Sequence, residues 1–192
     1  FSDGGKWNRQ DAALKHTEQM IQEGADIIDI GGESTRPGYE PVLAEEEIER
    51  VIPVIEKIRQ HFDIPISIDT YKSTVAKAAI AAGADLVNDI WGLKYDARLA
   101  GVIADAGVAC CLMHNRSQIQ EHPYENFMED LLMDLRETVQ TAKNAGIKED
   151  KIILDPGVGF AKSYENNLEA IRCLDQCRQL GFPILLGASR KS

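Results

Sequence analysis

The sequence predicts an α/β fold, a (β/α)8 barrel that is incomplete at both ends of this chain. Three observations predict it. Short apolar runs alternate with longer segments of helical periodicity, most helical segments end at a glycine just before the next apolar run, and polar residues gather where the apolar runs end. Strands that alternate with helices are typical of βα units around a parallel sheet. Runs that are apolar throughout are typical of strands covered on both faces.

Six apolar runs are predicted as strands. They cover 26–30, 64–69, 85–89, 108–113, 151–155 and 183–186. Every run except 64–69 follows a glycine, namely Gly24, Gly83, Gly107, Gly146 and Gly181. A glycine just after a helix adopts positive φ at little cost and turns the chain into the next strand. We therefore expect positive φ at these five positions.

Six helices are predicted between the strands, at 11–23, 44–60, 73–82, 97–106, 124–145 and 165–180. In the second of them, apolar side chains recur at helical spacing at Ile48, Val51, Ile52, Ile55 and Ile58. A doubly wound sheet and a barrel both fit this count of elements. No Gly-x-Gly-x-x-Gly follows the first strand, so the dinucleotide-binding fingerprint is absent.

The composition excludes several classes of protein. The 192 residues are 44% hydrophobic and 27% charged, as in globular domains. The net charge of −10 argues against a general nucleic-acid binder. No run approaches the roughly 18 apolar residues of a membrane span, and no signal peptide opens the chain. The four cysteines form no Cys-x-x-Cys pair, so we expect them to be thiols of a cytoplasmic protein.

Polar residues follow the apolar runs at one end. They are Glu33 with Arg36, Asp69, Asn88 with Asp89, His114, Asp155, and Ser189 with Arg190 and Lys191. In a barrel these ends converge on one face, where active sites lie. Any single aspartate among them is more simply the N-cap of the next helix, and His114 alone is more often structural. Capping does not explain the same pattern at six strands, so the barrel is favoured.

These residue types indicate the ligand. Carboxylates beside an apolar floor suit a flat heterocycle with adjacent N–H donors, because a carboxylate accepts two parallel hydrogen bonds. Arg36, Lys162, Arg190 and Lys191 are cations on the same face that suit phosphate or carboxylate groups. Glycines at 31–32, 157 and 159 allow the backbone to approach a ligand closely.

Seven motifs occur in an order that resembles one known family. They are Phe1-Ser-Asp-Gly-Gly5, Gly31-Gly-Glu-Ser-Thr-Arg-Pro-Gly38, Ser67-Ile-Asp-Thr70, Val87-Asn-Asp-Ile90, Leu112-Met-His114, Asp155-Pro-Gly-Val-Gly-Phe-Ala-Lys162 and Gly187-Ala-Ser-Arg-Lys-Ser192. Together they resemble the dihydropteroate synthases, the folate-pathway enzymes that sulfonamides inhibit. The resemblance covers essentially the whole chain. The second and last motifs are highly specific in combination.

The resemblance implies a TIM barrel, with residues 1–192 as a single truncated pterin-binding domain. It implies a cytoplasmic transferase that condenses 6-hydroxymethyl-7,8-dihydropterin diphosphate with 4-aminobenzoate to give 7,8-dihydropteroate and diphosphate, with Mg2+ assisting. Diphosphate leaves first, and the arylamine captures a dihydropterin cation. The implied partners are these small molecules and sulfonamide inhibitors, with a homodimer when the chain is complete and with no nucleic acid or membrane.

The resemblance also implies site residues by motif position. The pterin residues would be Asp69, Asn88, Met113, Asp155 and Lys191; the diphosphate residues Thr35 and Arg36; the 4-aminobenzoate residues Pro37, Gly159, Phe160 and Ser192; and the catalytic residues Asp69, Arg36 and Lys191. Asp155 would pair with the pterin N3–H and 2-amino edge. Phe1 and Ser2 would belong to a mobile loop over the site. The alternative for Phe160 is a loop aromatic that packs on its own barrel.

The sequence departs from the family at two points of the loop after Asp155. Val158 and Ala161 stand where the family usually has Phe and Gly. The chain also begins at Phe1 and stops at Ser192, inside a basic motif, so we expect a piece of a longer polypeptide. The family's magnesium ligand would then precede Phe1, leaving no metal ligand in this chain. An Arg-x-His that binds diphosphate would follow Ser192.

Two other functions remain open from the sequence. One is a pterin-binding barrel without turnover, which the fragment would be if it were the whole polypeptide. The other is a corrinoid-dependent methyltetrahydrofolate methyltransferase domain, which shares the barrel and the Asp/Asn pterin edge. That domain handles no diphosphate, so it would lack the Ser-Thr-Arg-Pro-Gly loop and the Ser-Arg-Lys-Ser end. Both segments are present here.

Overall fold

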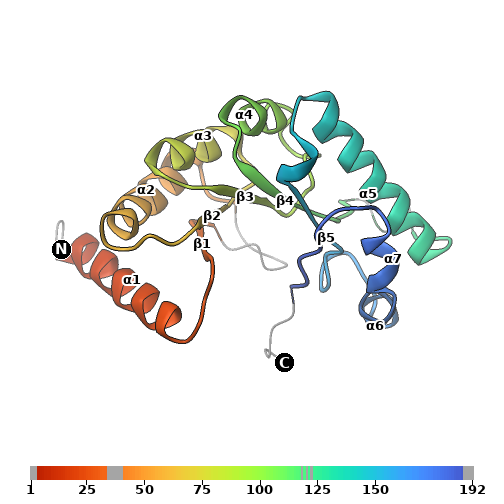
Figure 1. Cartoon of the computed structure of the whole chain (residues 1–192), viewed down its shortest axis with the longest axis horizontal. Helices are drawn as coiled ribbons and strands as arrows, with labels where there is room; N and C mark the ends of the chain where they lie inside the picture. The colour runs from red at the N-terminus through yellow and green to blue at the C-terminus, as the bar shows by residue number, and fades with distance from the viewer. Residues whose placement is uncertain (1–3, 34–40, 118, 120, 122, 188–192) are drawn as a thin grey trace. The chain divides into compact units, whose positions relative to one another are not determined.

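The computed structural model describes residues 4–33, 41–117, 119, 121 and 123–187 (Figure 1). The described strands are β1 (Ile28–Gly31), β2 (Ile66–Asp69), β3 (Leu86–Asp89), β4 (Ala109–Met113) and β5 (Ile152–Asp155), in the sheet order β1-β2-β3-β4-β5. β1 pairs with β2, and β4 with β5, in parallel. The chain divides into two compact units, 1–87 and 88–192.

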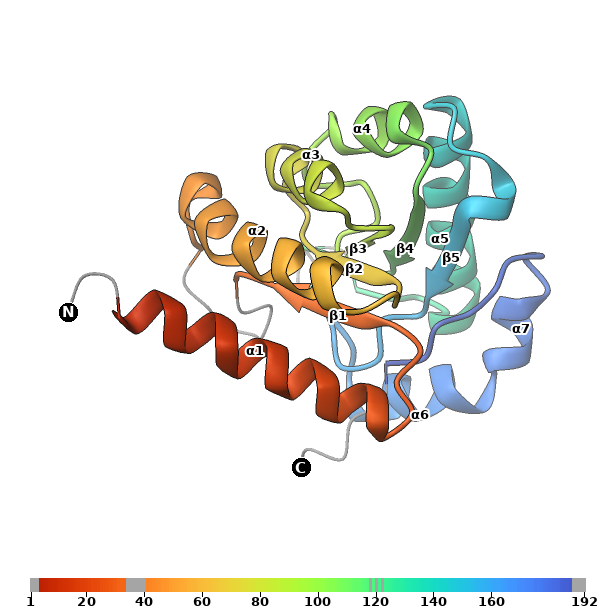
Figure 2. The ribbon, with the colours of Figure 1, turned by 60° about the vertical axis from the view of Figure 1, so that its left-hand side comes forward.

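The first unit packs helices against β1 and β2. α1 (Gly4–Gln22) lies beside α2 (Ala44–His61), which packs against α3 (Ser73–Ala82) (Figure 2). α2 buries Val51, Ile55 and Ile58, the same stripe that predicted the helix. Ile66 and Ile68 of β2 are fully buried. This core holds the carboxyl ends of β1 and β2 in fixed register.

The second unit begins within β3 and contains β4 and β5. Its helices are α4 (Leu99–Ala106), α5 (Phe127–Asn144), α6 (Tyr164–Arg172) and α7 (Leu174–Arg178), with a short 3-10 turn η1 (Glu149–Lys151) before β5. The core is formed by large aliphatic side chains of both helices and strands, namely Leu99, Ile103, Leu112, Leu131, Leu135, Ile152 and Leu154. No helix in the described ranges is long and apolar enough to cross a membrane.

Five of the six predicted strands are present, and the sixth prediction was wrong in extent. The run 183–186 contributes only an isolated bridge between Leu154 and Ile184. Leu154 N–H donates to Pro183 O, and Leu185 N–H donates to Leu154 O, each at 2.9 Å. Pro183 has no N–H to extend the ladder, and Leu185 is 41% exposed. The segment therefore lies alongside β5 without forming a strand in its described part.

The six predicted helices are present, but the first begins at Gly4 instead of Asp11, and one is divided. The segment 165–180 forms α6 and α7, separated at Cys173, whose φ and ψ of −104° and 24° leave the helical region. The helix predicted from 124 begins at Phe127. The five glycines that precede the predicted runs all have positive φ, between 66° and 115°. The four cysteines are free thiols.

Candidate functional site

In the first unit, Asp69 lies at the carboxyl end of β2. It is aligned with Gly31, the last residue of β1. A Cβ on Gly31 would lie 3.4 Å from the Cβ of Asp69, an ordinary van der Waals distance. The three residues of β2 before Asp69 are buried, whereas Asp69 is partly exposed. The carboxylate therefore lies at the strand end that the sequence predicted for it.

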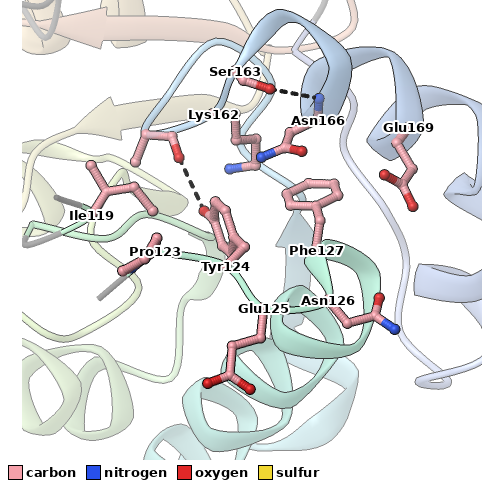
Figure 3. A pocket seen from close by; sticks show the side chains of 11 residues that line it. Ile119, Pro123, Tyr124, Glu125, Asn126, Phe127, Lys162, Ser163, Asn166 and Glu169 are labelled. Atoms are coloured by element: carbon pink, nitrogen blue, oxygen red, sulfur yellow. Dashed lines mark hydrogen bonds between the residues drawn. The ribbon is translucent and has the colours of Figure 1, made fainter. Parts of the chain in front are cut away.

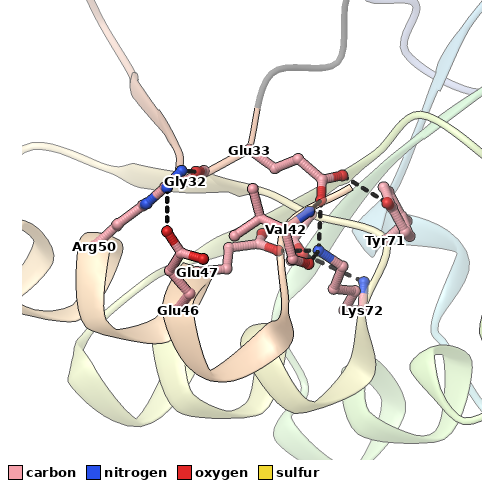
Figure 4. A network of polar contacts seen from close by, with 9 residues as sticks. Gly32, Glu33, Val42, Glu46, Glu47, Arg50, Tyr71 and Lys72 are labelled. Atoms are coloured by element: carbon pink, nitrogen blue, oxygen red, sulfur yellow. Dashed lines mark hydrogen bonds and ion pairs between the residues drawn. The ribbon is translucent and has the colours of Figure 1, made fainter. Parts of the chain in front are cut away.

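Glu33, just after β1, belongs to a buried ionic network around Lys72 (Figure 4). The Nζ of Lys72 donates to Glu33 Oε2 at 2.7 Å, to Glu47 Oε2 at 2.6 Å and to Val42 O at 2.7 Å. The Tyr71 hydroxyl donates to Glu33 Oε1 at 2.5 Å, and Val42 N–H donates to Glu33 Oε2 at 2.6 Å. The network thus connects Glu33, just after β1, to Val42, which lies two residues before α2.

Charge and close packing both hold this network together. Burial opposes ionisation of Glu33, but hydrogen bonds from Lys72, Tyr71 and Val42 outweigh it and lower the pKa of that carboxyl. Burial likewise opposes the charge on Lys72, but hydrogen bonds to Glu33 and Glu47 raise its pKa. Gly32 permits the packing, because a Cβ there would lie 2.8 Å from Glu47 Cγ. Glu33 is a structural residue.

In the second unit, the two polar residues at the end of β3 differ in environment. Asp89 is 1% exposed and accepts from Trp91 N–H at 2.8 Å and from Leu93 N–H at 2.6 Å. Burial raises the pKa of Asp89 to about 6, against the effect of these two donors. Its carboxylate holds the turn after β3, in which Leu93 has a φ of 67°. Asn88 is partly exposed and points to the opposite face of the strand.

Asp155 ends β5 and is aligned with Met113, the last residue of β4. Its Oδ1 accepts from Gly157 N–H at 2.7 Å, and its backbone O accepts from His114 N–H at 2.8 Å. Burial raises the pKa of the Asp155 carboxyl, while Gly157 N–H and Lys162 oppose that rise. The strands therefore bring two of the predicted pterin residues, Met113 and Asp155, side by side.

The loop after β5 folds tightly onto the end of β4. Gly157 has a φ of 70°, and a Cβ on it would lie 2.1 Å from His114 O, so no other residue fits. Phe160 is half-buried, and its N–H donates to Gly157 O at 3.1 Å. The exposed Gly159 donates its N–H to Asn167 Oδ1 at 2.7 Å. Ala161 has a φ of 48°, a left-handed conformation that disfavours residues with a Cβ.

Lys162, a loop cation that the sequence suggested for an anionic ligand, is bonded to groups of the protein in this structure. Its Nζ lies 3.0 Å from both Phe160 O and His114 Nδ1, so its donors are directed at groups of the protein. Burial lowers the pKa of Lys162 to about 7, against the attraction of Asp155. The ammonium thus binds the loop to the end of β4.

His114 takes the structural role that was its more common alternative. It is 2% exposed, and its Nε2 lies 2.8 Å from Asp134 Oδ2 on α5. Burial lowers the pKa of His114 to about 4, so the ring is neutral at pH 7. Arg116 Nε also donates to Asp134 Oδ2, at 2.7 Å. Sequence reasoning missed Asp134, although a carboxylate between the buried Leu131 and Leu135 was a detectable signal.

A cavity of about 830 Å3 lies in the second unit, between the segment before α5 and the loop after β5 (Figure 3). Its lining includes Ile119, Tyr124, Phe127, Ala161, Lys162 and Asn166. The Tyr124 hydroxyl donates to Ala161 O at 3.1 Å across one side of it. The sequence did not predict this cavity.

Several predicted site residues lie outside the described residues. They are Thr35, Arg36, Pro37, Lys191 and Ser192, together with Phe1, Ser2, Ser189 and Arg190. Within the described ranges, no three His, Cys, Asp or Glu side chains form a group that could hold a metal ion.

Comparison with known proteins identifies the family. The model of the family described as "Pterin binding enzyme" matches residues 1–192. The dihydropteroate synthases of Clostridium beijerinckii and Bacillus subtilis are 60% and 53% identical to this chain, over 192 and 191 residues. These matches cover 100% of this chain, and 70% and 66% of the two relatives. The chain thus spans about two thirds of the length of these relatives.

Solved structures agree with the sequence matches. A dihydropteroate synthase from Clostridium difficile, solved in the presence of pteroic acid, superposes with a TM-score of 0.93 at 49% identity, over 100% of this chain and 72% of that one. A Xanthomonas albilineans dihydropteroate synthase with 4-aminobenzoic acid gives 0.91 at 41%, over 100% and 69%. These enzymes have the TIM-barrel fold, which confirms the predicted fold class. The chain belongs to the pterin-binding enzyme family, and within it to the dihydropteroate synthases.

Proposed function

We propose that the chain forms most of an enzyme that condenses 6-hydroxymethyl-7,8-dihydropterin diphosphate with 4-aminobenzoate, giving 7,8-dihydropteroate and diphosphate. The observation that carries the proposal is the match to dihydropteroate synthases along all of this chain, with 60% identity to that of Clostridium beijerinckii. One related structure contains 4-aminobenzoic acid, and another contains 7,8-dihydropteroate. The carboxylates that end β2 and β5, Asp69 and Asp155, also support it.

In this proposal Asp155, Asn88 and Met113 bind the pterin ring. Asp155 offers carboxylate oxygens to the pterin N3–H and 2-amino group. An ionised carboxylate has about four acceptor positions, and Gly157 N–H occupies one of them. The Oδ2 atom of Asp155 lies near Gly187. A Cβ added to Gly187 would be 3.7 Å from Oδ2, an ordinary van der Waals distance. Met113, aligned with Asp155, supplies apolar surface beneath the ring.

Bond cleavage and cation stabilisation are assigned to a second set of residues. Thr35 and Arg36 would hold the departing diphosphate, and Lys191 would donate to acceptors of the pterin. Asp69 would stabilise the dihydropterin cation, because a fixed carboxylate opposite developing positive charge lowers the barrier. The described position of Asp69 at the end of β2 is compatible with this role.

The 4-aminobenzoate site is assigned to Pro37, Gly159, Phe160 and Ser192. Among these, Gly159 and Phe160 lie on the described loop after β5, next to Asp155 in the chain. Phe160 is half-buried, so part of its surface remains available to a ligand. A benzoate ring would then approach the pterin from the side of this loop.

The same proposal includes a single barrel domain over residues 1–192 that forms a homodimer in the cytoplasm. It also includes assistance by Mg2+ and inhibition by sulfonamides. Bound Mg2+ would neutralise charge on the diphosphate. The described residues hold no group that fits a metal ion, so no step here depends on it. The four free thiols are compatible with a reducing compartment.

The test is a diphosphate-release assay with both substrates, on this chain and on a version completed at both ends to the length of its relatives (the completed chain). We expect release from the completed chain that depends on both substrates. Pterin binding without release would support the non-catalytic alternative. Methyl transfer from methyltetrahydrofolate to a corrinoid, without diphosphate release, would support the methyltransferase alternative.

A further inference from the structure

Two successive backbone carbonyls of the loop after β5 are held by side chains. Lys162 Nζ donates to Phe160 O at 3.0 Å. The Tyr124 hydroxyl donates to Ala161 O at 3.1 Å (Figure 3). Exposed loop carbonyls are ordinarily left to water. Here the partly buried amine of Lys162 and the partly buried phenol of Tyr124 donate to them, so protein groups set the orientation of these two peptide groups.

Each of these two donors, Lys162 and Tyr124, contacts a residue that is bonded to Asp134 on α5. In one arm, Lys162 donates to His114 Nδ1 at 3.0 Å, and His114 Nε2 donates to Asp134 Oδ2 at 2.8 Å. The hydrogen of the His114 ring is therefore on Nε2, because Nδ1 accepts from Lys162 and so carries no hydrogen. The neutral ring follows from the burial that lowers its pKa to about 4.

In the other arm, Arg116 connects Asp134 to Tyr124. Arg116 Nε donates to Asp134 Oδ2 at 2.7 Å, and its guanidinium carbon lies 4.4 Å from the centre of the Tyr124 ring. Tyr124 then donates to Ala161 O. Asp134 therefore anchors two chains of contacts that end on neighbouring peptide groups.

The N–H groups of Lys162 are directed at the protein in both protonation states. Nζ lies 3.0 Å from Phe160 O and from His114 Nδ1, which take the two N–H groups of the neutral amine, and 3.4 Å from His114 O, which can take the third N–H of the ammonium. A substrate anion could bind Nζ only by displacing one of them. The geometry thus favours a role in holding the loop over a role in binding the substrate.

We propose that Lys162 is a positioning residue, which fixes the loop of Gly159 and Phe160 for 4-aminobenzoate through its bonds to Phe160 O and His114. The inference rests on the proposed function. Removing the donors of Lys162 would leave the loop to fluctuate, and the ordering cost would fall on the ligand that needs this loop. Affinity for 4-aminobenzoate then falls more than affinity for the pterin.

The test compares Lys162→Met with Lys148→Met in the completed chain. Methionine keeps much of the length of the lysine stem but has no N–H, and Lys148 is an exposed residue outside the site. We expect Lys162→Met to raise KM for 4-aminobenzoate at least tenfold and KM for the pterin substrate less than threefold. Tyr124→Phe, which removes only the phenolic oxygen of the second arm, should raise KM for 4-aminobenzoate about threefold.

A second measurement does not depend on turnover. Amide hydrogen exchange should rise at least tenfold over 157–162 in Lys162→Met, with no change there in Lys148→Met. A folded Lys162→Met protein with unchanged exchange and with KM for 4-aminobenzoate within twofold of wild type would overturn the proposal. Equal rises in both KM values would also overturn it. If wild type releases no diphosphate, the proposed function fails, and the exchange experiment still decides the role of Lys162. If Lys162→Met does not fold, Lys162→Gln, whose shorter side chain removes the ammonium from Phe160 O and His114, decides it by the same two measurements.

Discussion

The Nε2 atom of His114 lies 2.8 Å from the Oδ2 atom of Asp134, and the histidine side chain is fully buried. The pair joins the end of β4 to the middle of α5 in the second unit. Burial lowers the pKa of His114 to about 4, although Asp134 favours the protonated ring. The folded protein therefore requires a neutral histidine at this position, and this requirement has a measurable effect on stability.

Acid should destabilise wild type more than His114→Asn. The pKa of His114 is about 4 when folded and near 6.5 when unfolded, so between these values the unfolded chain binds a proton that the native state does not. Stability from this group is thus lost as pH falls through this range. We expect the stability difference between wild type and His114→Asn to shrink by about 2 kcal/mol from pH 7 to pH 5, at 1.36 kcal/mol per pH unit below 6.5.

Urea unfolding of both proteins at several pH values provides the measurement. Asp89, whose raised pKa acts in the opposite sense, is present in both proteins and cancels in the difference. Lys162, which contacts His114 and has a pKa of about 7, adds its own change near pH 7, so the slope is read between pH 6 and pH 5. A difference that stays constant from pH 7 to pH 5 would mean that the native state accepts the proton on His114.

Replacing Ala161 with glycine should stabilise the protein. Ala161 has a φ of 48°, and a left-handed residue with a Cβ costs roughly 1–2 kcal/mol. Glycine removes this cost but adds roughly 0.5–1 kcal/mol of entropy loss on folding. We expect a net gain of about 0.5–1 kcal/mol, measured as an increase in Tm. Ala81→Gly, at an exposed position of α3, should instead lower Tm. Equal decreases in both variants would contradict the assignment of strain to Ala161.

Lys72→Met should destabilise the first unit strongly. The substitution leaves Glu33 and Glu47, which are 8% and 1% exposed, without their shared cation. Removing one partner of a buried ion pair costs roughly 3–5 kcal/mol. The matched control is Arg98→Ala, which removes an exposed ion pair with Asp96 and should cost less than about 1 kcal/mol. Chemical denaturation of both variants compares them directly, and similar small losses would show that the Lys72 network adds little stability.

Asp155→Asn should lower turnover more than tenfold in the completed chain. The amide replaces one acceptor oxygen with a donor, which then faces either Gly157 N–H or the pterin edge. An unsatisfied buried donor costs roughly 1–3 kcal/mol. Asp150→Asn, on the exposed η1 turn, serves as the control. Calorimetric pterin affinity within threefold of wild type would rule out the proposed role of Asp155.

Sequence patterns predicted the elements that one stretch of chain determines by itself. The buried stripe of α2 and the apolar runs of β1 to β5 depend on local periodicity, and both were found. The sixth strand was overestimated, because an apolar run does not show whether a neighbour will pair along its whole length. Ile184 forms only one bridge.

The polar networks could not be predicted in the same way, because their members lie far apart in the sequence. Glu47 belongs to the acidic first turn of α2, which resembles an ordinary solvated helix start, yet its side chain is 1% exposed and bonded to Lys72. Lys162 looked like a cation for a ligand until its three acceptors within the chain were known. Strand-end positions were predictable, whereas the division between ligand-facing and structural side chains required coordinates.

The loop after β5 has one position, Gly157, where no side chain fits. Val158 and Ala161 carry side chains on this loop, whereas any side chain at Gly157 would collide with the carbonyl of His114. An inhibitor that gains its affinity from side chains at 158 or 161 therefore meets atoms that single substitutions can change. One that contacts the backbone around Gly157 meets a shape that a substitution can change only by displacing the end of β4.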